Sequence, residues 1–265
     1  MKKLSTLILL AFFSFGCSNP MENSMNPFFT DYDAPYQIPP FDEIKEEHYM
    51  PAFERGMKEQ LEEIDQIVDN LEQPTFENTL VELERTGKTL NKVADVFFNL
   101  LSSNTNEQMD KIAAEVSPKL SAHSDAISLN KKLFSRVNSV YEKRDELGLS
   151  TEQMRLVEET HKGFIRSGVQ LDTSSMEKLT QINQELSSLS VQFDQNLLKE
   201  TNEGYSLLID DKNQLDGLPK DFRDQAAKLA EENGHDGKWM FKPTRVSMYP
   251  FLTSVSYTHL RAHET

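Results

Sequence analysis

The sequence contains very little cysteine: Cys17 is the single thiol in 265 residues. One thiol cannot form an internal disulfide, so the fold must be stabilised by packing. Glycine and proline are also scarce, at 10 and 11 residues, which disfavours a chain built from many short strands and turns. Hydrophobic residues at 37% and charged residues at 27% are typical of a folded, helix-rich protein with a substantial core.

Basic residues are outnumbered. The chain has 28 lysines and arginines against 43 aspartates and glutamates, which gives a formal charge of −15. Nucleic-acid binding depends on clustered lysine and arginine that neutralise phosphates, and no basic stripe occurs here. The composition therefore argues against nucleic acid as a partner, and an acidic surface of this kind typically keeps a protein dispersed in water.

Catalytic motifs are missing as well. The sequence has neither the H-E-x-x-H of zinc peptidases nor the G-x-S-x-G of serine hydrolases. The nearest string is His259-Leu-Arg-Ala-His263, where two histidines have the spacing of zinc ligands but Leu260 occupies the place of the general base. We therefore predict no catalytic residue and no metal ligand in this chain.

The first seventeen residues resemble a bacterial lipoprotein signal. Lys2 and Lys3 precede an apolar run, residues 4–15, that is too short to span a bilayer, and Gly16 precedes Cys17. This interpretation implies cleavage before Cys17, lipidation of its thiol, and an exported protein anchored to a membrane of the cell envelope, on the periplasmic side. The alternative is an ordinary signal peptide with an incidental cysteine. Residues 18–40 lack periodicity and predict a tether.

The clearest structural pattern lies between Thr75 and Leu101. Eight residues alternate at spacings of four and three, and so predict one buried stripe on a single helix: Phe76, Leu80, Leu83, Gly87, Leu90, Ala94, Phe97 and Leu101. Thr75 follows Pro74 and is expected to cap the first turn. Gly87 within the stripe predicts that another helix crosses closely there.

The same periodicity predicts further helices over residues 41–71, 106–129, 133–147, 150–164 and 174–203. Capping boxes are expected at Ser150–Gln153 and Ser174–Glu177. His123 lies on an apolar helix face, where we expect a core or groove residue rather than a ligand. Runs at 205–209 and 238–241 predict two paired strands with a helix between them. The expected fold is mostly α: an elongated multi-helix bundle over residues 41–253, with one small β element near residues 205–241.

Four separated motifs together resemble the thimet oligopeptidase family, in particular its dipeptidyl carboxypeptidase and oligopeptidase A branch. They are the segment Pro74-Thr-Phe-Glu-Asn-Thr-Leu-Val-Glu-Leu-Glu84, the segment Leu120-Ser-Ala-His-Ser-Asp-Ala-Ile127 with Leu133-Phe134 following, residues 179–201, and Leu215-Asp-Gly-Leu-Pro219 with Gly237-Lys-Trp239. The resemblance covers residues 38–253 and the amino-terminal half of the family. It implies a mostly helical wall of a deep channel, oligopeptide substrates, and zinc held by an H-E-x-x-H helix and a glutamate outside this chain.

The resemblance stops at Ser254. Residues 254–265 have neither helical nor strand periodicity and look like translated sequencing-adapter sequence joined to a truncated gene, so we expect a non-native tail.

Two hypotheses follow from the sequence. The first is the amino-terminal part of a lipid-anchored zinc metallopeptidase of the peptidyl-dipeptidase type, inactive by itself. The second is a non-enzymatic helical lipoprotein that acts as a scaffold or binding module. They differ in whether the gene continues beyond Thr253 to an H-E-x-x-H.

Overall fold

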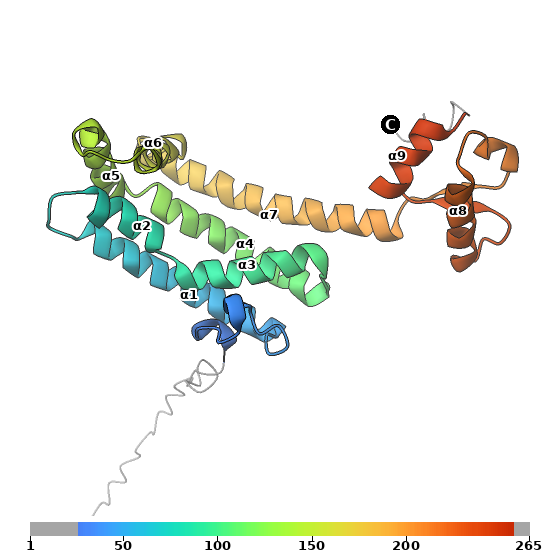
Figure 1. Ribbon diagram of the computed structural model, residues 1–265, viewed down its shortest axis with the longest axis horizontal. Helices are drawn as coiled ribbons and strands as arrows, with labels where there is room; N and C mark the ends of the chain where they lie inside the picture. The colour runs from blue at the N-terminus through green and yellow to red at the C-terminus, as the bar shows by residue number, and fades with distance from the viewer. Residues whose placement is uncertain (1–25, 257–265) are drawn as a thin grey trace, which may run out of the picture. The chain divides into compact units, whose positions relative to one another are not determined.

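The computed structural model describes residues 26–256, and helices dominate it (Figure 1), which confirms the mostly α fold class. The described part of the chain divides into two compact units, the first ending at Glu185 and the second beginning at Leu186. The predicted signal, with Cys17, lies outside the described residues. Within residues 26–256, no helix combines the length and the apolar character needed to cross a membrane.

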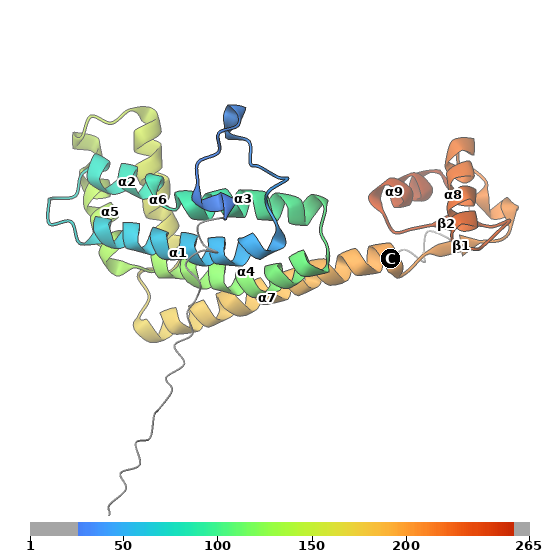
Figure 2. The same cartoon turned by 90° about the horizontal axis from the view of Figure 1, so that it is seen from below.

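The first unit is built from packed helices. Helix α1 lies beside α3 and α4, and α5 packs against α6, as Figures 1 and 2 show. The elements in chain order are η1 (Pro27–Phe29), η2 (Pro35–Gln37), α1 (Glu46–Val68), η3 (Phe76–Val81), α2 (Glu82–Arg85), α3 (Lys88–Ser103), α4 (Glu107–Ser128), α5 (Lys131–Lys143), η4 (Arg144–Glu146), α6 (Thr151–Arg166) and the start of α7 (Thr173–Glu203). Element η3 is a π-helix.

The single helix predicted from Thr75 to residue 102 is wrong, because the chain breaks at Gly87. Thr75 does cap the first turn: its hydroxyl accepts from the backbone N–H of Asn78 at 3.1 Å. Gly87, however, has φ +78, in the left-handed region, and its N–H donates to a carboxylate oxygen of Glu63 at 2.7 Å. Glycine adopts this backbone without a Cβ penalty, so α3 starts anew at Lys88.

Helix α1 crosses closely at this break, as Gly87 had predicted. A Cβ at Gly87 would lie 2.6 Å from the side-chain nitrogen of Gln60, and a Cβ at Gly56 would lie 2.7 Å from the backbone nitrogen of Leu90. The two glycines lie on opposite partners of the crossing. They let the backbone at Gly56 approach the backbone of Leu90, and the backbone at Gly87 approach the side chain of Gln60.

The expected tether over residues 18–40 requires correction from Asn26 onward. Phe28 is 1% exposed, and its ring centroid lies 5.6 Å from that of Tyr49, which in turn lies 5.0 Å from Phe97. The Asn26 side chain also donates to the carbonyl of His48 at 2.8 Å. Burial of a phenylalanine in an aromatic cluster stabilises the folded state by about 2 kcal/mol, so this segment belongs to the folded unit.

Helix starts follow local capping chemistry. Helix α1 begins at Glu46 rather than at residue 41. The capping box at Ser150 and Gln153 is confirmed by two reciprocal bonds of 3.3 and 2.9 Å. The box predicted at Ser174–Glu177 is wrong. Asp172 accepts instead from the backbone N–H and the hydroxyl of Ser175, at 3.0 and 2.8 Å, because a carboxylate is favoured at the positive end of a helix.

The second unit contains the predicted small β element, which is confirmed. Strands β1 (Leu207–Ile209) and β2 (Trp239–Phe241) pair antiparallel, with Leu207 opposite Phe241 and Ile209 opposite Trp239 (Figure 2). Its other elements are the end of α7, η5 (Lys212–Leu215), α8 (Lys220–Glu232) and α9 (Arg245–Ser254). The core gathers around the sheet and comprises Ile209, Leu215, Leu218, Ala226, Phe241, Phe251 and Val255.

The expected tail over residues 254–265 is described only at its start. Helix α9 extends to Ser254, and Val255 is buried in the core of the second unit. The N–H of Ser256 donates to the carbonyl of Asp216 at 2.9 Å. The remaining residues, including His259 and His263, lie outside the described residues, so the origin of the tail stays a prediction.

Candidate functional site

The resemblance to the thimet oligopeptidase family implies zinc, which proteins bind through clustered His, Cys, Asp or Glu side chains. Over residues 26–256, no three side chains of His, Cys, Asp or Glu lie close enough together to hold a metal ion. The described residues therefore do not fit a zinc site, and we derive no catalytic step through zinc from them. Cys17, His259 and His263 fall outside the described part of the chain.

His123 lies in the core of the first unit, on α4, and is 8% exposed. Its Nε2 lies 2.7 Å from the side-chain oxygen of Gln60 on α1. Gln60 in turn donates to the hydroxyl of Thr86 at 3.2 Å, next to the Gly87 break. An amide oxygen only accepts, so the His123 Nε2 carries the hydrogen. Burial lowers the pKa of His123, and the histidine therefore acts as a neutral donor that joins α4 to α1.

Arg136 on α5 is a second buried polar centre, and sequence reasoning missed it. Its guanidinium donates to the carbonyls of Asn70 and Glu72, at 2.7 and 3.2 Å, and to the side-chain oxygen of Asn78 at 3.1 Å. Asn78 also donates to the carbonyl of Gln73 at 3.0 Å. Arg136 thereby fixes the connector between α1 and η3, including the Thr75 cap. These donors are used within the fold, so Arg136 has a structural role.

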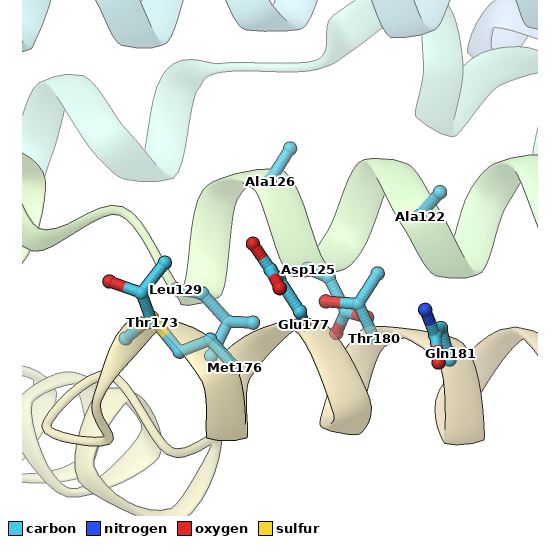
Figure 3. A pocket seen from close by; sticks show the side chains of 9 residues that line it. All are labelled: Ala122, Asp125, Ala126, Leu129, Thr173, Met176, Glu177, Thr180 and Gln181. Carbon is cyan, nitrogen blue, oxygen red and sulfur yellow. The ribbon is translucent and has the colours of Figure 1, made fainter.

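A groove lies between α4 and α7 in the first unit. Its volume is about 500 Å³, and Figure 3 shows its nine lining residues on the two facing helices: Ala122, Asp125, Ala126, Leu129, Thr173, Met176, Glu177, Thr180 and Gln181. The residues of each helix are three or four apart and so share one face. Ala122 and Ala126 are small, which leaves this volume open between the helices.

Asp125 is the polar anchor of the groove. It is nine-tenths buried, and both its carboxylate oxygens accept from the side-chain nitrogen of Asn183, at 2.9 and 3.1 Å. Figure 3 shows Asp125 and Glu177 in the space between the helices. The lining contains carboxylates, hydroxyls and amides but neither histidine nor cysteine. Sequence reasoning did not identify Asp125 as a site residue, although it lies within the segment Leu120-Ser-Ala-His-Ser-Asp-Ala-Ile127 that resembles the family.

Comparison with known proteins gives the family. No protein-family model matches the sequence. The chain is 36% identical over 232 residues to dipeptidyl carboxypeptidase of Escherichia coli, which covers 88% of the chain and 34% of that protein. The dipeptidyl carboxypeptidase of Salmonella typhimurium is 37% identical with the same coverage. Oligopeptidase A of Haemophilus influenzae is 28% identical over 226 residues, covering 84% of the chain and 32% of the relative.

The chain belongs to the thimet oligopeptidase family. It spans about a third of the length of the curated relatives it matches, and those relatives are peptidases. The recognition made from the four motifs is therefore confirmed.

Proposed function

We propose that this chain is the amino-terminal, non-catalytic part of a longer zinc metallopeptidase. The parent protein removes dipeptides from the carboxyl end of oligopeptides, and its zinc ligands lie outside this chain. The chain by itself binds no zinc and cleaves no peptide. Its contribution to the parent is a helical framework that carries the buried polar ties of His123, Asp125 and Arg136.

One observation carries this proposal. An alignment with each of two dipeptidyl carboxypeptidases covers 88% of this chain. The same alignment covers only 34% of the length of either relative. About two thirds of a peptidase thus has no counterpart here.

The decisive experiment starts from the gene. A long sequencing read across codon 253 should show a reading frame that continues to an H-E-x-x-H. The full-length product should then release dipeptides from an oligopeptide with a free carboxyl end, lose this activity with a chelator, and regain it with zinc. Residues 18–265 alone should release none. Chelator-sensitive cleavage by residues 18–265 would overturn the placement of the site.

The cellular location is a separate part of the proposal. Export and lipidation at Cys17 are supported by the basic start, the short apolar run and the placement of the single cysteine. Expressed with its own signal in a bacterial host, the protein should fractionate with membranes and be released by detergent. Cys17→Ala should remove it from the membrane fraction. A Cys17→Ala protein that stays with membranes would contradict lipid anchoring.

A gene that ends at codon 265 would favour the other hypothesis, a helical lipoprotein that acts as a scaffold. The peptidase proposal would then fail.

A further inference from the structure

Helix α7 is exceptional within the described chain. It has 31 residues, more than any other described helix, and none of them is buried. In proteins, a helix gains most of its stability by packing an apolar face, because helix propensity in water is marginal. A long helix without a buried residue therefore lacks a packing partner along much of its length.

The unpacked surface is an ordered stripe. Within the second unit, Leu186, Leu189, Phe193 and Leu197 follow one another at spacings of three, four and four, so they share one helix face. Their exposed fractions are 60%, 52%, 65% and 55%. We call these four residues the α7 stripe. Isolated exposed leucines are common on folded proteins, but a contiguous apolar row of this kind marks an interaction surface.

We infer that the α7 stripe is the surface on which the remaining part of the parent peptidase packs, through an apolar helix face of its own. This inference rests on the proposed function. The occupant is suggested by length, since about two thirds of each dipeptidyl carboxypeptidase relative has no counterpart in this chain. The stripe has no polar side chain, so its partner must also be apolar. Rows spaced by three and four residues interlock with similar rows on another helix.

A second copy of this chain is a poorer occupant. Two copies would each bring a formal charge of −15, and like charges oppose association. Four side chains also expose far less surface than the ~800 Å² per partner that a stable complex buries. A segment of the same polypeptide avoids most of the entropic cost of association, so a narrow stripe is sufficient for it.

The test compares one double substitution in two proteins. Leu189→Ala with Phe193→Ala removes the centre of the stripe and keeps good helix formers. In the full-length protein, it should lower the midpoint of thermal unfolding by about 5 °C or more, because buried apolar side chains are lost. In residues 18–265, the same pair should leave the helical content and the midpoint unchanged to within about 1 °C, because these side chains are already exposed there.

The matched control lies outside the stripe on the same helix. Gln192 and Lys199 are exposed, and their replacement by alanine should leave the midpoint unchanged or slightly raised in both proteins. If the double variant fails to fold at full length, Leu189→Ala alone gives the same comparison. All melts are made at one scan rate, because large proteins often unfold irreversibly.

Each other outcome identifies what fails. If the double substitution lowered the midpoint of thermal unfolding equally in both proteins, the α7 stripe would pack within this chain. If it left the midpoint of an active, zinc-dependent full-length peptidase unchanged, nothing would pack on the α7 stripe. A full-length dimer that the double substitution dissociates would make a second copy the occupant. These results overturn the inference alone, whereas a reading frame that ends at codon 265 overturns it together with the proposed function.

Discussion

Gly56 of α1 lies directly against Leu90 of α3: a Cβ at position 56 would be 2.7 Å from the Leu90 backbone nitrogen and 2.8 Å from its Cα. Backbone atoms cannot move aside as the end of a flexible side chain can. This contact therefore sets how closely the two helices approach, and it explains why glycine, a poor helix former, occupies position 56 in the middle of α1.

Gly56→Ala should destabilise the first unit by about 1–3 kcal/mol, because the added methyl forces α1 away from α3. Gly163→Ala in α6 is the matched control. It is also a helical glycine, but nothing lies within 4 Å of the place that an alanine methyl would take, so it should stabilise by about 0.5–1 kcal/mol. Urea unfolding followed by circular dichroism measures both. Equal effects at the two positions would contradict the close crossing.

Gly87→Ala should cost more than Gly148→Ala. Both glycines have positive φ, +78 and +63, so each alanine pays roughly 1–2 kcal/mol for the left-handed backbone. At Gly87 the methyl would also displace Gln60, which holds His123 and Thr86, whereas at Gly148 nothing lies within 4 Å. The difference between the two unfolding free energies should be about 1–2 kcal/mol, for two displaced hydrogen bonds. Equal unfolding free energies for the two variants would mean that Gln60 moves aside and keeps its hydrogen bonds with His123 and Thr86.

Arg136→Ala should destabilise the first unit by about 2–4 kcal/mol. Its loss leaves the carbonyls of Asn70 and Glu72 and the side chain of Asn78 without their donor. Arg85→Ala is the control, since Arg85 makes only an exposed ion pair with Glu82 and should cost less than about 0.5 kcal/mol. Limited proteolysis supplies a second readout, because cleavage near Leu71, which is fully exposed, should quicken only in the Arg136 variant.

Acidification should weaken the first unit through two histidines, the buried His123 and the half-buried His161. Burial lowers the pKa of His123, and burial together with Arg144 lowers the pKa of His161, although Glu142 acts in the opposite direction. The unfolded chain, with histidine pKa values near 6.5, then binds more protons than the folded one, so stability falls as pH drops below about 6.5. Above that pH both states are neutral at these positions and the effect vanishes.

Denaturant unfolding at pH 5, 6, 7 and 8 measures this dependence. His123→Gln keeps an amide donor for Gln60 and cannot be protonated, so it should flatten the profile between pH 5 and 7. A variant with the same slope as the wild type would show that His123 does not contribute to it.

Elements defined by neighbouring residues were predictable from the sequence. The cap of α6 needs only Ser150 and Gln153, and the two strands were visible as short apolar runs flanked by turns. The Gly87 break was not predictable in the same way. Its geometry depends on Glu63 and Gln60, more than twenty positions earlier, and periodicity alone extends smoothly across it.

The candidate site was less accessible to sequence reasoning than the fold. His123 was correctly expected to be a core or groove residue, because it lies on an apolar face. The roles of Asp125 and Arg136 depend on partners 58 to 66 positions away, and one charged residue in a helical stretch carries no signal of its partner. The prediction of the cap of α7 was wrong for a local reason. Two neighbouring residues could have capped the helix, and the carboxylate of Asp172, not the hydroxyl of Ser174, accepts the hydrogen bond from the first turn.

The pairing of β1 with β2 has a consequence during protein synthesis. Ile209 can pair with Trp239 only after Trp239 has left the ribosome. The roughly thirty residues between them, added at ~5–20 per second, take about 2–6 s to synthesise. For that interval β1 has an open edge and the core around Phe241 and Phe251 is incomplete. The apolar residues of β1 thus stay unpaired until Trp239 has been made, and a ribosome that stalls between positions 209 and 239 would prolong this exposure.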